Sequence, residues 1–228
     1  MEVEQIEPEG WREPRPLREP LLTAPWTIVA LSGGLVILYA LQCLALSQAQ
    51  VIALGLSPVS LATGRWQGLF TSQFLHASWA HVLMNSVAAL AFGPPVARLL
   101  GTDARGAAVF FAFYLACGAL AGLGYAGLNP HQADVLVGAS GAVSGLLGAA
   151  SRLIQGHGRI GPLLGSTVVG MAIAWAIVNV ILGVSGLTPG AAGLPVAWQA
   201  HLAGYAAGAL LIGPFARLAG LGDGAFAR

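Results

Sequence analysis

The chain has very few charged residues and is dominated by apolar ones. Only 8% of its 228 residues are Asp, Glu, Lys or Arg, whereas a soluble domain usually contains about 25%. Hydrophobic residues make up 56% of the sequence, in runs too continuous for a porin-like barrel, whose strands alternate apolar and polar residues. The composition therefore predicts an all-α membrane protein. A formal net charge of +1 also provides no basic surface for nucleic acid.

Lysine is absent, so all ten basic residues are arginines. Together with frequent Ala and Gly, this usage is typical of a GC-rich genome and points to a bacterial inner-membrane protein. The 32 glycines suit closely packed transmembrane helices. Cysteine is also scarce, with Cys43 and Cys117 both inside apolar stretches. We expect buried free thiols, although a disulfide between them is compatible with the sequence.

Acidic residues are concentrated at the N-terminus, where residues 1–25 contain six Glu, three Arg and five Pro. This segment has neither the basic start nor the apolar core of a signal peptide. We expect a disordered cytosolic tail over 1–25, a membrane domain over 26–218, and a short cytosolic tail over 219–228.

Six apolar stretches are long enough to cross a bilayer as helices, which takes about 20 residues. They cover residues 27–46, 79–97, 106–127, 136–153, 163–187 and 196–216. The semi-polar segment 47–78 is expected to hold short interfacial helices, with Trp66 and Trp79 at headgroup depth. The sequence therefore predicts a bundle of six transmembrane helices.

The arginines orient this bundle. If the N-terminus is cytosolic, the cytosolic side receives Arg12, Arg15, Arg18, Arg98, Arg105, Arg152, Arg159, Arg217 and Arg228, and only Arg65 lies outside. This asymmetry predicts cytosolic N- and C-termini, because cytoplasmic loops carry the excess of basic residues. The second, fourth and sixth helices then start on the outer side.

Polar residues gather near those three outer ends. They are His81 and Asn85, Ser140 and Ser144, and Gln199 and His201, each within about two turns of a helix start at 1.5 Å per residue. Polar groups within a bilayer face the bundle interior or a water-filled cavity and mark a site by default. Ser and His are also the pair needed for nucleophilic catalysis. The alternative is that Ser140 and His201 only hydrogen-bond helices together.

Glycines favour the catalytic interpretation. Gly138 and Gly141 flank Ser140, while Gly204 and Gly208 follow His201 in GxxxG spacing, and small faces let two helices approach closely. We therefore expect the helices that carry Ser140 and His201 to pack until the imidazole reaches the hydroxyl.

Other side chains are candidates for supporting roles. His81 and Asn85 share one helical face and are placed to donate hydrogen bonds to an oxyanion, with the Ser140 backbone N–H as a third donor. Alternatively, Asn85 satisfies a carbonyl of a neighbouring helix. Asp134 could orient His201 as a third triad member, but a dyad is favoured because a carboxylate at headgroup level would have to fold inward. Asn179, in the fifth span, receives no role.

Several chemistries are disfavoured, and no metal or cofactor is expected. No HExxH motif occurs, and His76, His81 and His201 have no carboxylate or thiol among them to complete a metal site. The spans contain no Asp or Glu, which argues against an acidic ion path or an aspartyl protease. A transporter is disfavoured because the halves show no repeat and the polar layer lies near one face.

Three short motifs together resemble the rhomboid family of intramembrane serine proteases. "GASGA" (138–142) matches the Gly-x-Ser-Gly nucleophile motif, "AHLAG" (200–204) the motif of the general base, and "HASWAHVLMN" (76–85) the second-helix His-x-x-x-Asn signature. The resemblance covers about residues 27–217. It implies that Ser140 is the nucleophile, His201 the general base and acid, His81 and Asn85 the oxyanion hole, and His76 a structural hydrogen-bonding residue.

The resemblance also implies a serine endopeptidase whose substrates are single-pass membrane proteins, cleaved where their helices unwind near the outer interface. Some positions depart from the family pattern: Gln67 follows Trp66 where Arg is frequent, Ala97 lies in "PPVAR" (94–98) where an acidic residue is common, and Ser144 replaces an aromatic. We therefore expect His201 to be held differently here. The competing hypothesis is a catalytically silent rhomboid-like scaffold that binds membrane helices.

Overall fold

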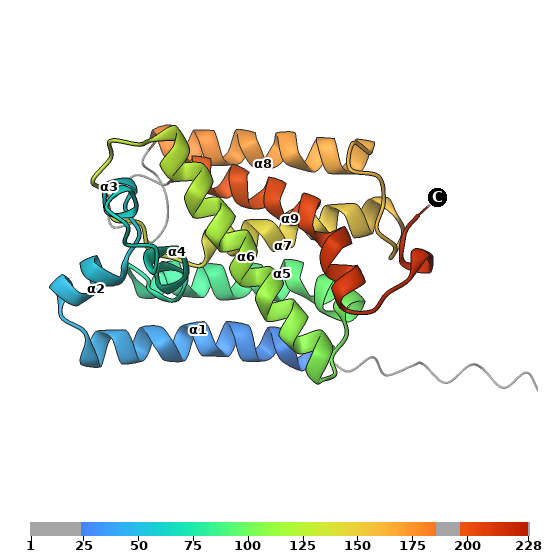
Figure 1. Ribbon diagram of the computed structural model, residues 1–228, viewed down its shortest axis with the longest axis horizontal. Helices are drawn as coiled ribbons and strands as arrows, with labels where there is room; N and C mark the ends of the chain where they lie inside the picture. The colour runs from blue at the N-terminus through green and yellow to red at the C-terminus, as the bar shows by residue number, and fades with distance from the viewer. Residues whose placement is uncertain (1–23, 186–196, 228) are drawn as a thin grey trace, which may run out of the picture.

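The computed structural model of the chain describes residues 24–185 and 197–227, and its regular elements in these ranges are all helical. The order, drawn in Figure 1, is α1 (Trp26–Ala45), α2 (Gln48–Leu54), α3 (Pro58–Ala62), α4 (Gly68–Thr71), η1 (Ser72–Phe74), α5 (Trp79–Leu100), α6 (Ala104–Leu128), α7 (Ser140–Gln155), α8 (Ser166–Ser185), α9 (Trp198–Leu218) and η2 (Asp223–Ala225). The predicted all-α class is confirmed, and short helices do occupy the segment 47–78. Residues 1–23, to which we assigned a disordered tail, lie outside the described residues.

Within the described residues, four helices are long and apolar enough to cross a membrane: α1, α5, α6 and residues 166–183 of α8. The helices at the other two predicted spans, α7 and α9, are not among them. The α7 helix has only 16 residues, which is about 24 Å at 1.5 Å per residue and short of the roughly 30 Å hydrocarbon core.

Local capping explains where the helices around the site begin and end. The Ser78 side chain accepts a hydrogen bond from His81 N–H and caps α5, and Gly101, with a positive φ of 99°, ends it. Asp103 then accepts from Gly106 N–H to start α6. Because the glycine that ends α5 is followed two residues later by an acidic N-cap, the chain reverses within three residues.

The α7 helix lies at the centre of the bundle. It packs against α5, α6, α8 and α9, while α1 is on the far side of α5 (Figure 1). Most α7 side chains from Ala142 to Leu153 are buried, including those of Ser144 and Ser151. A helix enclosed by protein on this scale does not need a lipid-compatible surface, which explains why α7 is shorter and more polar than its neighbours.

The α8 helix is at the edge of the bundle and presents a broad apolar surface. Ile173, Ile177 and Ile181 follow one another at four-residue spacing and are more than half exposed. Residues four apart share one face of a helix. An exposed apolar face of this kind suits contact with lipid.

The short helices α2–α4 lie at the end of the bundle where α5, α7 and α9 begin, and both ends of the described chain lie at the other end (Figure 1). The chain just before α7 is extended, and Leu136 forms an antiparallel bridge with Leu56. The predicted start of the fourth span near residue 136 is therefore wrong by four residues, because backbone pairing holds residues 135–138 out of the helix.

The last residues fold back onto the bundle. Phe226 forms a parallel bridge with Ile160, and the Arg217 guanidinium lies 5.1 Å from the centre of its ring. Of the two cysteines, Cys117 is buried, Cys43 is exposed, and neither forms a disulfide.

Candidate active site

Ser140 is the first residue of α7, and the backbone before it is held by two neighbours. Gly138 has a φ of 129°, a conformation that favours glycine. Its N–H donates to Ser72 O over 2.9 Å, and the Ala139 N–H donates to His76 Nε2 over 3.4 Å. As the first helical residue, Ser140 has a backbone N–H that the helix itself does not use.

His76 joins the first helix to this turn. Its ring is almost fully buried, and its backbone forms a reciprocal pair with Gln42 of α1: Gln42 Nε2 donates to His76 O over 2.8 Å, and His76 N–H donates to Gln42 Oε1 over 3.0 Å. Burial, reinforced by the nearby His81, lowers the pKa of His76 to about 3. The ring is therefore neutral, as a nitrogen that accepts a hydrogen bond must be.

Ser140 and His201 are in direct contact. His201, in the first turn of α9, places Nε2 2.7 Å from Ser140 Oγ, within the range for a nucleophile and its base. The predicted contact between the two helices is thus confirmed. The catalytic roles of Ser140 and His201 stay predictions.

Glycines make this contact sterically possible. A Cβ on Gly204 would collide with Gly141 O, and a Cβ on Gly208 would collide with Gly145 O. The backbones of α7 and α9 therefore touch along consecutive turns, as expected for small-residue faces. This approach brings His201 to the start of α7.

The second nitrogen of His201 has a partner that the sequence analysis missed. His201 Nδ1 is hydrogen-bonded to Asn179 Oδ1 of α8, and not to Asp134, the residue considered for a third triad member. The ring of Trp175, one turn earlier in α8, lies 6.3 Å from the His201 ring at an angle of 39°. Two α8 side chains therefore flank the imidazole.

Ser144 does not take the place of the missing aromatic. Its hydroxyl is buried and donates to Ser140 O over 2.8 Å, within the same helix. The expectation that His201 is held differently agrees with this geometry, because the aromatic ring beside His201 comes from α8 and not from α7.

His81 and Asn85 lie next to the backbone that precedes Ser140. A Cβ on Gly138 would be 2.7 Å from His81 Cε1 and 3.8 Å from Asn85 Nδ2. Asn85 is buried, and among the described residues its Nδ2 has no hydrogen-bond partner. The alternative, in which the Asn85 amide nitrogen donates a hydrogen bond to a carbonyl of a neighbouring helix, therefore finds no support. A free donor faces the region of Ser140.

These side chains surround one cavity of about 460 Å³. Its lining includes His81, Asn85, Ser140 and His201. Asp134 and Met84 also line it. Most of the predicted polar layer therefore lines one cavity, with Ser144 outside its lining. The cavity brings together a hydroxyl, two imidazoles and an amide nitrogen that has no hydrogen-bond partner among the described residues.

Comparison with known proteins identifies the family of the chain. The family model "Rhomboid domain" matches residues 63–217, more than half of the chain. Over 90 residues, or 40% of its length, the chain is 37% identical to YdcA of Bacillus subtilis (strain 168), which is described as a candidate rhomboid protease; the match spans 42% of that relative's length. The chain therefore belongs to the rhomboid family of multi-pass membrane proteins.

Proposed function

We propose that this protein is an intramembrane serine endopeptidase that cleaves transmembrane segments of membrane proteins near the outer interface. The observation that carries the proposal is the 2.7 Å separation between Ser140 Oγ and His201 Nε2. A serine hydroxyl is a weak nucleophile until a neighbouring base takes its proton. An imidazole in hydrogen-bonding contact is such a base.

In the first half of the reaction, His201 Nε2 takes the Ser140 proton as Oγ attacks the scissile carbonyl carbon. The tetrahedral intermediate then collapses: the C–N bond breaks, and His201 gives the same proton to the leaving amine. The products of this half are a free amine and an ester on Ser140. The imidazole ends in its starting protonation state.

The oxyanion of that intermediate needs donors, and we assign them to Asn85 Nδ2, His81 and the Ser140 N–H. The support is that Asn85 Nδ2 is buried and has no hydrogen-bond partner among the described residues, which is costly for a polar group unless a ligand satisfies it. One preorganised donor of this kind typically contributes about 10²–10³ in kcat.

The second half hydrolyses the ester. A water molecule in the cavity loses a proton to His201 Nε2 and attacks the acyl carbon. The bond between the acyl carbon and Ser140 Oγ then breaks, His201 returns the proton to Oγ, and the carboxylic acid product leaves. This step requires water at membrane depth. The 460 Å³ cavity beside Ser140 is large enough to hold several molecules.

We further propose six membrane crossings, with both termini in the cytosol and the site near the outer face of a bacterial inner membrane. The arginine asymmetry supports this orientation. A short α7 is compatible with a crossing, because it is enclosed by α5, α6, α8 and α9 and only the surrounding helices need to match the bilayer.

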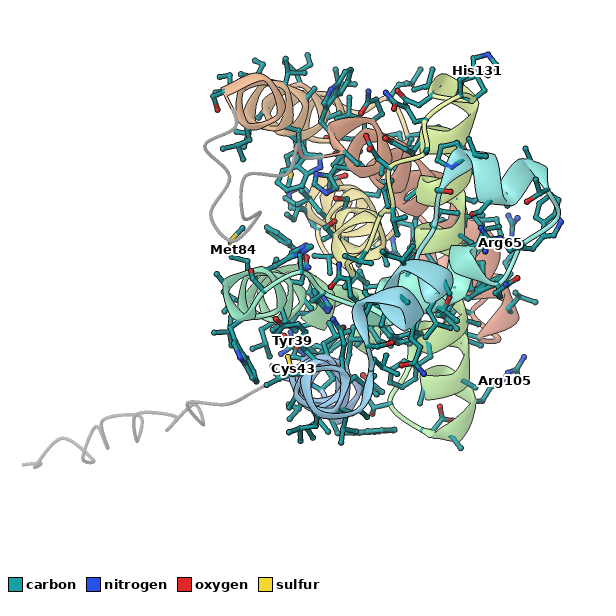
Figure 2. The ribbon with its side chains drawn as sticks, turned by 90° about the vertical axis from the view of Figure 1, so that its left-hand side faces the viewer. Tyr39, Cys43, Arg65, Met84, Arg105 and His131 are labelled. Atoms are coloured by element: carbon teal, nitrogen blue, oxygen red, sulfur yellow. The ribbon has the colours of Figure 1, made fainter. Side chains whose placement is uncertain are left out.

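Single-pass membrane proteins are the proposed substrates, and their unwound segments would enter laterally past α8. Met84 lines the cavity and is 44% exposed. In Figure 2 it projects from α5 at the edge of the bundle, on the side towards α8. Met84 therefore links the lining of the cavity to the surface of α5 on the side of α8, which supports substrate entry between these two helices.

The test uses purified protein with a model transmembrane substrate. We expect Ser140→Ala and His201→Ala each to abolish cleavage while keeping the melting temperature of the unmodified protein. A fluorophosphonate probe is expected to label the unmodified protein at Ser140 and to leave Ser140→Ala unlabelled. Undiminished cleavage by either variant refutes the assignment. Absence of both cleavage and labelling in the unmodified protein favours the scaffold hypothesis.

A further inference from the structure

Asn179 is a polar side chain in an otherwise apolar helix. Its neighbours along α8 are Val178 and Val180, both exposed, whereas Asn179 is only 2% exposed. A buried amide costs free energy unless it is hydrogen-bonded. The partners of Asn179 therefore indicate why an Asn is placed here.

The orientation of the Asn179 amide follows from its two contacts. Its Nδ2 donates to Trp175 O, one turn earlier, over 2.9 Å, and its Oδ1 faces His201 Nδ1. Reversing the amide would set Oδ1 against the Trp175 carbonyl, which can only accept. The backbone of α8 thus directs the oxygen, and not the nitrogen, to His201.

An acceptor at Nδ1 selects one form of the neutral imidazole. A neutral ring carries its single proton on one nitrogen and accepts with the other, and the partner of the first nitrogen decides which. With Asn179 Oδ1 at Nδ1, the proton is on Nδ1 and the lone pair is on Nε2. Nε2 is the atom 2.7 Å from Ser140 Oγ.

We propose that Asn179 is a positioning residue that holds His201 in the Nδ1–H tautomer and orients its ring towards Ser140. The inference rests on the proposed function, because only an unprotonated Nε2 can remove the Ser140 proton in that reaction. The same carbonyl oxygen also stabilises the imidazolium formed during each half-reaction. The unit is then Ser140–His201–Asn179, with a neutral amide as the third group.

The experiment compares two replacements that keep the shape of Asn179. Asn179→Leu removes the acceptor, whereas Asn179→Asp keeps an oxygen at Nδ1. We expect Asn179→Leu to lower kcat by about 10- to 100-fold, the range seen when a group that orients a metal-ligating histidine is removed, with KM unchanged. Asn179→Asp is expected to retain several-fold more activity than Asn179→Leu. Val180→Ala, an exposed neighbour in the same helix, is the control and should match the unmodified protein.

Nitrogen chemical shifts of ¹⁵N-histidine-labelled protein report the tautomer without any turnover. The chain has five histidines, and the His201 signals are identified by their loss in His201→Ala. We expect the Nδ1–H form in the unmodified protein and a loss of that preference in Asn179→Leu.

Three outcomes overturn the inference: an Nε2–H form in the unmodified protein, an unchanged tautomer in Asn179→Leu, or a kcat in Asn179→Leu within twofold of normal. Failure of the proposed function gives a different result. The Ser140→Ala protein would then still cleave substrate, while the nitrogen shifts would still report the Nδ1–H form of His201.

Discussion

The amide nitrogen of Asn85 is buried, and no described protein group accepts a hydrogen bond from it. Most buried polar groups in folded proteins are hydrogen-bonded, so each exception requires an explanation. Under the proposed mechanism, this donor is kept free for the negative charge that forms on the substrate oxygen during the reaction. A donor of this kind lowers the stability of the resting fold, and the proposed gain in reaction rate would offset that cost.

This interpretation predicts that Asn85→Leu separates activity from stability. The variant is expected to lose about 10²–10³ in kcat, because one oxyanion donor is gone. Its melting temperature is expected to equal or exceed that of the unmodified protein, since an amide without a hydrogen-bond partner is replaced by an apolar group of similar size. Circular dichroism melts and turnover of a model substrate measure the two quantities. A kcat near normal would remove Asn85 from the oxyanion site.

The neighbours of His201 show how far single residues could be predicted. The contact with Ser140 was foreseeable, because glycines and polar residues at one depth indicated which helices meet. The contact with Asn179 was not, because it depends on the rotation of α8 about its axis. The nearly uniform apolar sequence of α8 leaves that rotation undetermined.

Helices α7 and α9 are joined through backbone contact, and their stability is therefore sensitive to a single methyl group. A Cβ on Gly208 would collide with the carbonyl oxygen of Gly145. Relief of this clash requires α9 to move away from α7, which also carries His201 away from Ser140. The packing of α7 against α9 and the proposed catalytic contact therefore depend on the same interface.

We predict that Gly208→Ala destabilises the protein by about 1–3 kcal/mol, the usual cost of overpacking, and lowers turnover. Gly170→Ala in α8 is the matched control, because a Cβ there has nothing within 4 Å. Alanine favours a helix by about 0.5–1 kcal/mol over glycine, so the control should be at least as stable as normal. Thermal melts compare the pair, and equal melting temperatures would show that α7 and α9 do not touch as described.

Helix boundaries were predictable where a local signal exists. Ser78, Gly101 and Asp103 are recognisable caps, and α5 and α6 begin or end beside them. The start of α7 was misplaced because its determinant is the long-range pairing of Leu136 with Leu56. Hydropathy alone carries no information about such pairing.

Ser140 and His201 lie in the first turns of α7 and α9. These helices begin at one end of the described bundle, and both ends of the described chain lie at the other (Figure 1). Arg98, Arg152 and Arg217 lie in the last turns of α5, α7 and α9, at the end opposite to Ser140. Because basic residues mark the cytoplasmic side of membrane proteins, the candidate site would open to the outside.

Reporter fusions in a bacterial host test this orientation. Alkaline phosphatase, which is active only outside the cytoplasm, is expected to be inactive when fused after Arg228 and active when fused after His131. Green fluorescent protein at the same two positions serves as the reciprocal control, with fluorescence expected only at the C-terminal position. The opposite pattern would invert the topology and place the site at the cytosolic face.

The pair of hydrogen bonds between Gln42 and His76 shows that the structural support of the candidate site extends beyond the region matched by the family model. The family match begins at residue 63, yet α1 holds the backbone of the histidine that accepts from Ala139. A fragment cut at the edge of the match would lose this support one residue away from the candidate nucleophile. Excised domains or chimaeras of this chain should therefore retain α1.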